Sequence, residues 1–168
     1  MNPPRASESV KEPQVRRIGA SDGDLLALLG TTTRIKVSSR DTLGTFFVGQ
    51  AKLPPDAFVP PHFHPDVELF FVLEGTLEVM RLSGGEAEFL HITAGEMALI
   101  PSNSVHGFRN ATADHVHVVV IGGPEIEGFL REAGSARVGP ASGPPAPDEL
   151  ERMLEIAKRH GQVFLAGR

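Results

Sequence analysis

The segment HFHPDVE, residues 62–68, places two histidines and a glutamate directly before the apolar run LFFVL. In an extended strand, side chains at positions i and i+2 point to the same side, so His62 and His64 can reach one point in space. Glu68 follows a proline-containing turn and opens the next strand. Burying a carboxylate is costly unless a cation meets it. Glu68 is therefore either a surface residue at a strand edge or a group that binds a positive ion inside the protein.

The strand that begins at Glu68 favours the second alternative. Phe70 and Val72 share the face of Glu68, and the opposite face is apolar as well. A strand with two apolar faces is typically buried on both sides. We therefore expect Glu68 to point into a barrel, and the opposite face to contact a second element or a second subunit. That opposite face carries Leu69, Phe71 and Leu73.

A third histidine follows in GEMALIPSNSVHGFRN, residues 95–110. His106 begins a further strand, and Phe108 shares its face. Three imidazoles and one carboxylate suit a divalent transition metal such as Fe, Mn, Co, Ni, Cu or Zn. Four protein ligands leave two positions of an octahedron for water, O₂ or a substrate oxygen. We expect one such ion per subunit, with Phe70, Val72 and Phe108 as walls of the adjoining substrate pocket.

A second HxH pair, His115 and His117, has no carboxylate or third histidine at a useful spacing. We expect this pair on the outer face or at an interface, and a place in the pocket is the alternative.

The composition limits the remaining chemistry. Cysteine, tyrosine and tryptophan are absent, which excludes thiolate ligands, disulfides and a tyrosine general acid. A net charge of −5 argues against nucleic acid as a partner. No apolar stretch reaches the ~20 residues that span a membrane, and the first residues lack the apolar core of a signal peptide. We expect a cytoplasmic protein that binds a small molecule, and neither nucleic acid nor a membrane.

Short strands must position the candidate ligands. Between residues 31 and 121, runs rich in Val, Ile, Phe and Thr are separated by turn clusters such as SGGE and AGE. Eight such runs with no helical segment between them predict an all-β sandwich or barrel, over residues 18–123. The runs are TRIKVSS, GTFFVGQAKL, VELFFVL, TLEVMRL, AEFLHI, MALIP, HGFRN and HVHVVVI.

The segments that flank the barrel have a different composition. Residues 1–17 are polar and contain proline, which predicts a flexible arm. The segment SDGDLLALLG, residues 21–30, predicts a short N-terminal helix that ends at Gly30.

Residues 124–168 predict a helical C-terminal extension. PEIEGFLREAG predicts a short helix, and a proline- and glycine-rich connector follows it. An amphipathic helix is expected over residues 147–160, ending at Gly161. Its predicted apolar stripe consists of Leu150, Met153, Leu154 and Ala157.

The two histidine-containing segments resemble the two motifs of the cupin family. The first is similar to G(x)5HxH(x)3–4E(x)6G, through His62, His64, Glu68 and Gly75. The second is similar to G(x)5PxG(x)2H(x)3N, through Gly95, Pro101, His106 and Asn110. Asp56 and Asn103 stand where each pattern has a glycine. Asn and Asp tolerate a left-handed backbone best after glycine, so we expect both turns to form.

The resemblance implies a double-stranded β-helix, or jelly-roll barrel, with metal ligands at His62, His64, Glu68 and His106. The chain as a whole is similar to single-domain bacterial cupins of the quercetin 2,3-dioxygenase type. That similarity favours a metal-dependent dioxygenase-like enzyme for a flat or apolar substrate, such as a flavonol, catechol or diketone. Glu68 would also be the catalytic proton acceptor if burial raises its pKa.

Two alternatives remain open at this point. One is a non-catalytic cupin that binds a metal or a small molecule, and the other is a Zn- or Mn-dependent isomerase or lyase. The resemblance also implies a homodimer, which would cover the apolar surface that one small barrel leaves exposed.

Overall fold

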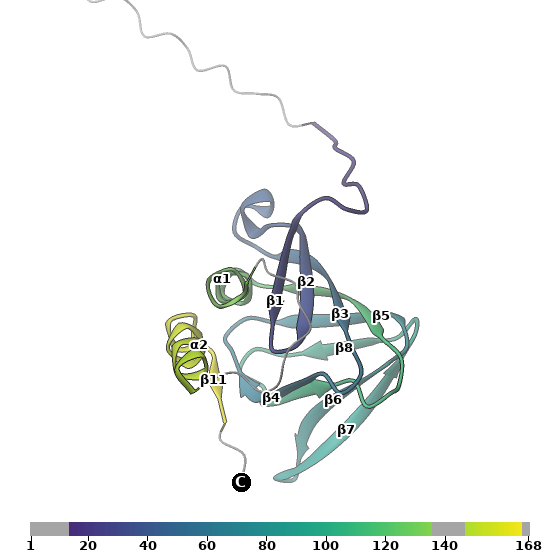
Figure 1. Ribbon diagram of the computed structural model, residues 1–168, viewed down its shortest axis with the longest axis vertical. Helices are drawn as coiled ribbons and strands as arrows, with labels where there is room; N and C mark the ends of the chain where they lie inside the picture. The colour runs from purple at the N-terminus through teal and green to yellow at the C-terminus, as the bar shows by residue number, and fades with distance from the viewer. Residues whose placement is uncertain (1–13, 136–146, 166–168) are drawn as a thin grey trace, which may run out of the picture.

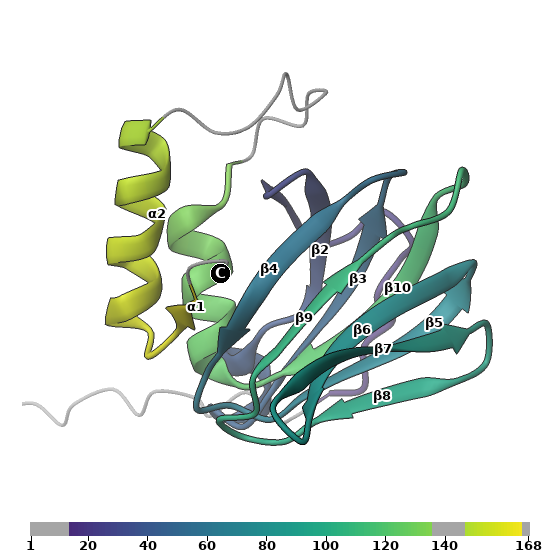
Figure 2. The ribbon, with the colours of Figure 1, turned by 90° about the horizontal axis from the view of Figure 1, so that it is seen from below.

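The computed structural model describes residues 14–135 and 147–165. These residues form two antiparallel sheets that face each other, with two helices together on one side of the barrel (Figures 1 and 2). The first thirteen residues of the predicted arm and most of the predicted connector lie outside the described residues. None of the described helices is long and apolar enough to cross a membrane.

The first sheet has six strands in the order β1-β2-β3-β10-β5-β8, and the second has five in the order β11-β4-β9-β6-β7. The predicted all-β, double-sheet barrel is confirmed. The strands of the first sheet are β1 (Asp24–Leu28), β2 (Thr31–Val37), β3 (Phe47–Leu53), β10 (Val116–Gly122), β5 (Glu68–Glu74) and β8 (Met97–Ile100). Those of the second are β11 (Val163–Phe164), β4 (Phe58–Phe63), β9 (His106–Arg109), β6 (Thr76–Ser83) and β7 (Glu86–Thr93).

The core lies between the sheets and is built by alternation along each strand. In β10 (VHVVVIG), Val116, Val118 and Val120 are buried, and the residues between them are only half-buried. His117 is one of these outward residues, with its ring 3.6 Å from Glu74, and His115 is exposed. The outer-face prediction for this second HxH pair is therefore confirmed.

The predicted helix over residues 21–30 is wrong, because this segment forms β1. It pairs with β2 from Asp24↔Ile35 to Leu28↔Thr31. Leu29 and Gly30 make the two-residue turn between them, with φ of 50° and 74°, as a type I′ hairpin requires. The left-handed Gly30, which suggested the end of a helix, therefore belongs to a hairpin turn. The backbone groups of residues 24–28 form hydrogen bonds with β2 and not within a helix.

The first sheet keeps an apolar outer face. On β5, Leu69 and Phe71 are half-buried and Leu73 is 47% exposed, while Met97 and Leu99 of β8 are 53% and 63% exposed. Burial of β5 on both sides is therefore incomplete within one chain, because no element among the described residues covers this face.

Helices α1 (Pro124–Ala133) and α2 (Pro147–Arg159) confirm the predicted helical extension. On α2, Met153, Ile156 and Ala157 are buried in a cluster with Phe129 of α1. The predicted apolar stripe is right at Met153 and Ala157 only. Leu150 and Leu154 are each 40% exposed, because they lie at the edge of the narrow strip that contacts α1 and β11.

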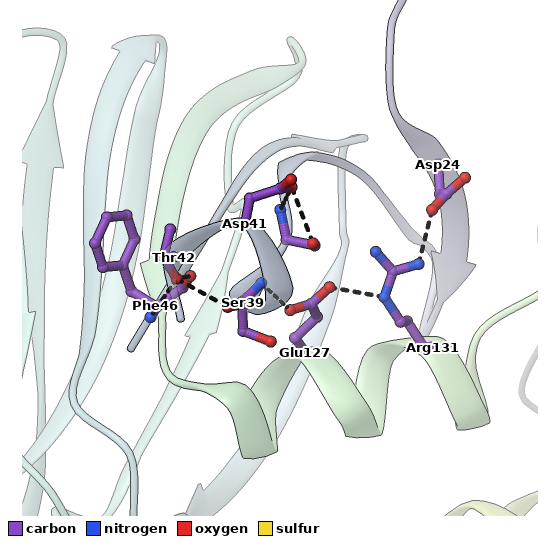
Figure 3. Close-up of polar contacts among 8 residues, drawn as sticks. Asp24, Ser39, Asp41, Thr42, Phe46, Glu127 and Arg131 are labelled. Atoms are coloured by element: carbon purple, nitrogen blue, oxygen red, sulfur yellow. Dashed lines mark hydrogen bonds and ion pairs between the residues drawn. The ribbon is translucent and has the colours of Figure 1, made fainter. Parts of the chain in front are cut away.

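A buried carboxylate fixes α1 to the first sheet (Figure 3). Glu127 is only 3% exposed, and its two oxygens accept hydrogen bonds from the Ser39 amide at 2.6 Å and from Arg131 Nε at 2.7 Å. Arg131 also donates to Asp24 of β1 at 2.7 Å. Burial by itself raises the pKa of Glu127, but the bonds from Ser39 and Arg131 outweigh burial and lower it. The side chain is therefore ionised and ties α1 to the short 3₁₀ helix Ser39–Thr42 and to β1.

We expect Glu127→Gln to lower the free energy of unfolding by about 2 kcal/mol, because it removes a charged acceptor from a buried contact. Urea denaturation followed by circular dichroism measures the change. The matched control is Glu86→Gln at an exposed position of β7, which should change the value by less than about 0.5 kcal/mol. Equal stability of the two variants would contradict this reading.

Candidate metal centre

Strand pairing brings the four predicted ligands together. His62 lies on β4 and is the register partner of His106 on β9. His64 follows β4, and Glu68 begins β5 in the opposite sheet. The histidines are 5%, 2% and 2% exposed, and Glu68 is 6% exposed, so all four side chains are removed from solvent.

The geometry of the cluster is compact. Candidate ligand nitrogens of His62, His64 and His106 lie within 4.8 Å of one another. Oε2 of Glu68 lies 3.4 Å from Nε2 of His64 and 3.4 Å from Nε2 of His106. The three histidines could therefore hold a metal ion, and the carboxylate stands beside two of them.

Backbone carbonyls fix the tautomer of each ring. Because a carbonyl oxygen can only accept, each Nδ1 must carry the hydrogen and each neutral Nε2 keeps its lone pair for a metal. This is how proteins orient metal-binding imidazoles. The carbonyls are those of Pro60 for His62 at 2.8 Å, Asp66 for His64 at 2.9 Å, and Ser104 for His106 at 2.9 Å.

Two of these Nε2 atoms, on His64 and His106, are buried without a hydrogen-bond partner. Such orphaned polar atoms cost about 1–3 kcal/mol each unless something satisfies them. The 3.4 Å contacts to Glu68 bring a negative charge close but do not form aligned hydrogen bonds. A divalent cation would satisfy both nitrogens and the carboxylate, so this donor set fits a metal such as Zn, Fe, Mn, Co, Ni or Cu.

The protonation states follow from burial and from mutual contacts. Burial, followed by repulsion from His106, lowers the pKa of His62 to about 4. Burial also acts to lower the pKa of His64, but the Glu68 carboxylate outweighs it and the pKa is raised. For Glu68, burial acts to raise the pKa, yet His106 and His64 lower it to about 2. The expectation of a burial-raised pKa for Glu68 is therefore wrong, and its carboxylate is ionised at neutral pH.

The two turns with unexpected residues form as predicted. Asp56 has φ of 61° and Asn103 has φ of 59°, the left-handed region in which glycine usually stands. The Asn103 amide donates to the His64 carbonyl at 2.8 Å. This bond ties the turn before β9 to the segment that carries His64. Asp56 and Asn103 thus preserve the backbone geometry that glycine would otherwise supply.

A cavity of about 80 Å³ adjoins His62, His64 and Glu68. Phe70 and Phe108 line it, with ring centroids 4.9 Å apart, as predicted. Val72 does not line the cavity. It lies two residues beyond Phe70 on β5 and is fully buried in the core. Apart from the ligands, two threonines and Gln162, the lining is apolar.

One end of this cavity is closed by residues that were not predicted from the sequence. From α1 come Ile126, Phe129 and Leu130, and from the C-terminal segment come Gln162 and Phe164. Phe164 pairs with His62 in the sheet, and its ring stacks on the imidazole at 5.0 Å and 24°. The sequence after Gly161 contains only a short apolar alternation, too brief to predict a strand at the site.

Asp66, in the turn between His64 and Glu68, has a second function. Its Oδ2 accepts hydrogen bonds from the Glu125 amide at 2.8 Å and the Ile126 amide at 3.0 Å. These are free amides of the first turn of α1. The same residue that orients His64 through its carbonyl therefore also holds α1 against the cavity.

Residues 49–122 match the family model described as a cupin domain, and no curated protein matches the sequence. Among solved structures, the polyketide cyclase RemF from Streptomyces resistomycificus has a TM-score of 0.57 at 22% identity, over 86% of this chain and 97% of that chain. A protein of Thermotoga maritima, described as a predicted oxalate decarboxylase, has a TM-score of 0.56 at 16% identity, over 64% of this chain and 98% of that chain.

A recombinant oxalate oxidase has a TM-score of 0.49 at 24% identity, over 58% of this chain, and the chain spans about half of its length, 52%. The likenesses to the polyketide cyclase and to the Thermotoga maritima protein show the fold alone, because the identities are only 22% and 16%. Over residues 49–122 the sequence is therefore similar to cupin domains, and the fold of the chain resembles that of the first two solved structures.

Proposed function

We propose that this protein is a metal-dependent enzyme that binds one divalent transition metal through His62, His64, Glu68 and His106. The observation that carries the proposal is the pair of buried, unpartnered Nε2 atoms beside an ionised carboxylate. All three rings are held in the tautomer that metal binding requires. The cluster opens onto an apolar cavity, as a substrate site does.

The leading reaction class in this proposal is dioxygenase-like chemistry on a small apolar molecule with an oxygen donor, of catechol, diketone or flavonol type. A metal held by these four residues would supply Lewis acidity toward a substrate oxygen or O₂. Phe70 and Phe108 exclude water from one wall of the cavity and offer flat surfaces to an aromatic or conjugated substrate. The polyketide cyclase and the oxalate-related proteins share the fold, and their named activities do not select one for this chain.

Glu68 is proposed as a ligand rather than as the proton acceptor. A carboxylate whose pKa is lowered to about 2 is a weak base at neutral pH. Its charge instead offsets that of a bound cation inside an apolar barrel.

A homodimer also remains our proposal, because exposed apolar side chains on β5 and β8 are those that a partner would cover.

We expect untagged protein to contain about one divalent transition metal per chain, by elemental analysis. His106→Ala should weaken metal binding about 100-fold or more, because it removes a ligand rather than a supporting contact. The matched control is His91→Ala, an exposed histidine on β7. Wild-type protein that neither contains nor takes up metal would refute the proposed function.

Metal affinity should fall as the pH is lowered, because a proton and a metal compete for Nε2 of His64. The pKa of His64 is raised above 6.5, so the loss begins above pH 6.5 and approaches tenfold per pH unit below the pKa. Near pH 4 His62 adds a second proton, while Glu68 stays ionised down to about 2. Calorimetric titrations between pH 5 and 8 test this, and an affinity independent of pH would exclude His64 as a ligand.

Oxygen uptake separates the candidate reactions. Protein loaded in turn with Fe, Mn, Ni, Co or Cu should consume O₂ with at least one catechol, diketone or flavonol in an oxygen-electrode screen. Turnover without O₂ uptake would favour an isomerase or lyase, and metal binding without any turnover would favour a binding protein. If Glu68→Gln keeps its metal and its activity, the carboxylate is neither a required base nor a required charge.

A further inference from the structure

The cavity beside the metal ligands contains a polar side chain that the metal site does not use. Gln162 lines this cavity and is only 4% exposed. Its backbone amide donates to Ala157. Within residues 14–135 and 147–165, no hydrogen bond reaches its side-chain amide. Thr31, which also lines the cavity, differs in this respect, since its hydroxyl donates to the Leu28 carbonyl at 2.8 Å.

The position of Gln162 is set on both sides by backbone structure. Its amide bond to Ala157 O, at 2.8 Å, ends α2, and Gly161 turns the chain with φ of 68°. Immediately afterwards β11 pairs with β4, where Phe164 stacks on the ligand His62. Gln162 therefore stands between the end of α2 and strand β11, which touches the metal site.

A largely buried amide without a protein partner lowers the stability of a protein, and an apolar side chain of the same size would not. A glutamine at this position is explained if a ligand completes its hydrogen bonds. The amide offers both a donor and an acceptor, so it can receive a hydroxyl or a carbonyl. Sites that hydrogen-bond a substrate group discriminate strongly against analogues that lack the group.

We propose that Gln162 is a specificity-determining residue, whose side-chain amide binds a second polar group of a small, mainly apolar substrate held by the metal. The substrate class is thereby narrowed to molecules with a metal-binding oxygen at one end and a hydroxyl or carbonyl away from it. This inference rests on the proposed function. It also gives the C-terminal extension a direct part in substrate selection.

Gln162→Met, which conserves volume, tests the unpartnered state of the amide. We expect Tm to rise by about 2–4 °C, with zinc affinity unchanged. A glutamine with a structural role would instead give a lower Tm when replaced. The matched control is Val163→Ala on the adjacent, half-exposed position of β11, which should not affect zinc or ligand binding.

A matched ligand pair tests the recognition itself, with zinc-loaded protein and isothermal calorimetry. Wild-type protein should bind 4-(hydroxymethyl)catechol about tenfold more tightly than 4-methylcatechol. Gln162→Met should lose this preference, and Val163→Ala should keep it. A wild type that does not favour the hydroxylated ligand, or a variant that still does, overturns the assignment of Gln162. Failure of the wild type to bind zinc is a separate outcome, because it refutes the metal site.

Discussion

The barrel is organised around one buried carboxylate. Glu68 lies at 6% exposure between two sheets of apolar side chains, and its Oε2 lies 3.4 Å from the imidazoles of His64 and His106. Those contacts lower its pKa to about 2 although burial acts in the opposite direction. A carboxylate in such surroundings is expensive to bury unless positive charge accompanies it. The geometry therefore fits a cation-binding site, in which the three histidines would be the other ligands.

The strands and turns around this carboxylate position the candidate ligands and also hold neighbouring elements in place. Pairing of β4 with β9 makes His62 and His106 neighbours, and the Asn103 amide ties the turn before β9 to the His64 carbonyl. Asp66 orients His64 through its backbone and holds the first turn of α1 through its side chain. As a result, the ligands and the helix that closes the cavity share one short turn. The turn between His64 and Glu68 therefore connects the candidate metal site to the wall of the cavity.

The C-terminal extension is part of the site rather than an appendage. Strand β11 joins the second sheet beside β4, and its Phe164 covers His62. Packing of Met153, Ile156 and Ala157 against Phe129 holds α2 on α1. The cavity is consequently formed by the barrel and by the extension together. If the proposal for Gln162 is right, changes in the extension would alter which small molecule is bound while the four candidate metal-binding residues stay the same.

Much of this could be derived from residue types and spacing alone. The alternation of apolar residues predicted the barrel strands. The i, i+2 histidines, the carboxylate before a doubly apolar strand and the third histidine predicted the cluster. The left-handed turns at Asp56 and Asn103 were expected from the resemblance to the cupin motifs, which have glycine at both positions, because Asp and Asn tolerate that conformation. These features are local, so short stretches of sequence carry them.

Long-range packing decided the rest. The segment 21–30 contains a run that suits helix or strand equally, and only its partner β2 selects the strand. The expected raised pKa of Glu68 failed because the sign depends on how close two imidazoles come, which spacing cannot tell. The prediction that Val72 lines the pocket was wrong, because the sequence does not show how far the cavity extends along β5. Gln162 and Phe164 reach the site only because α2 folds back on α1, so their role depends on tertiary contacts between segments far apart in the chain.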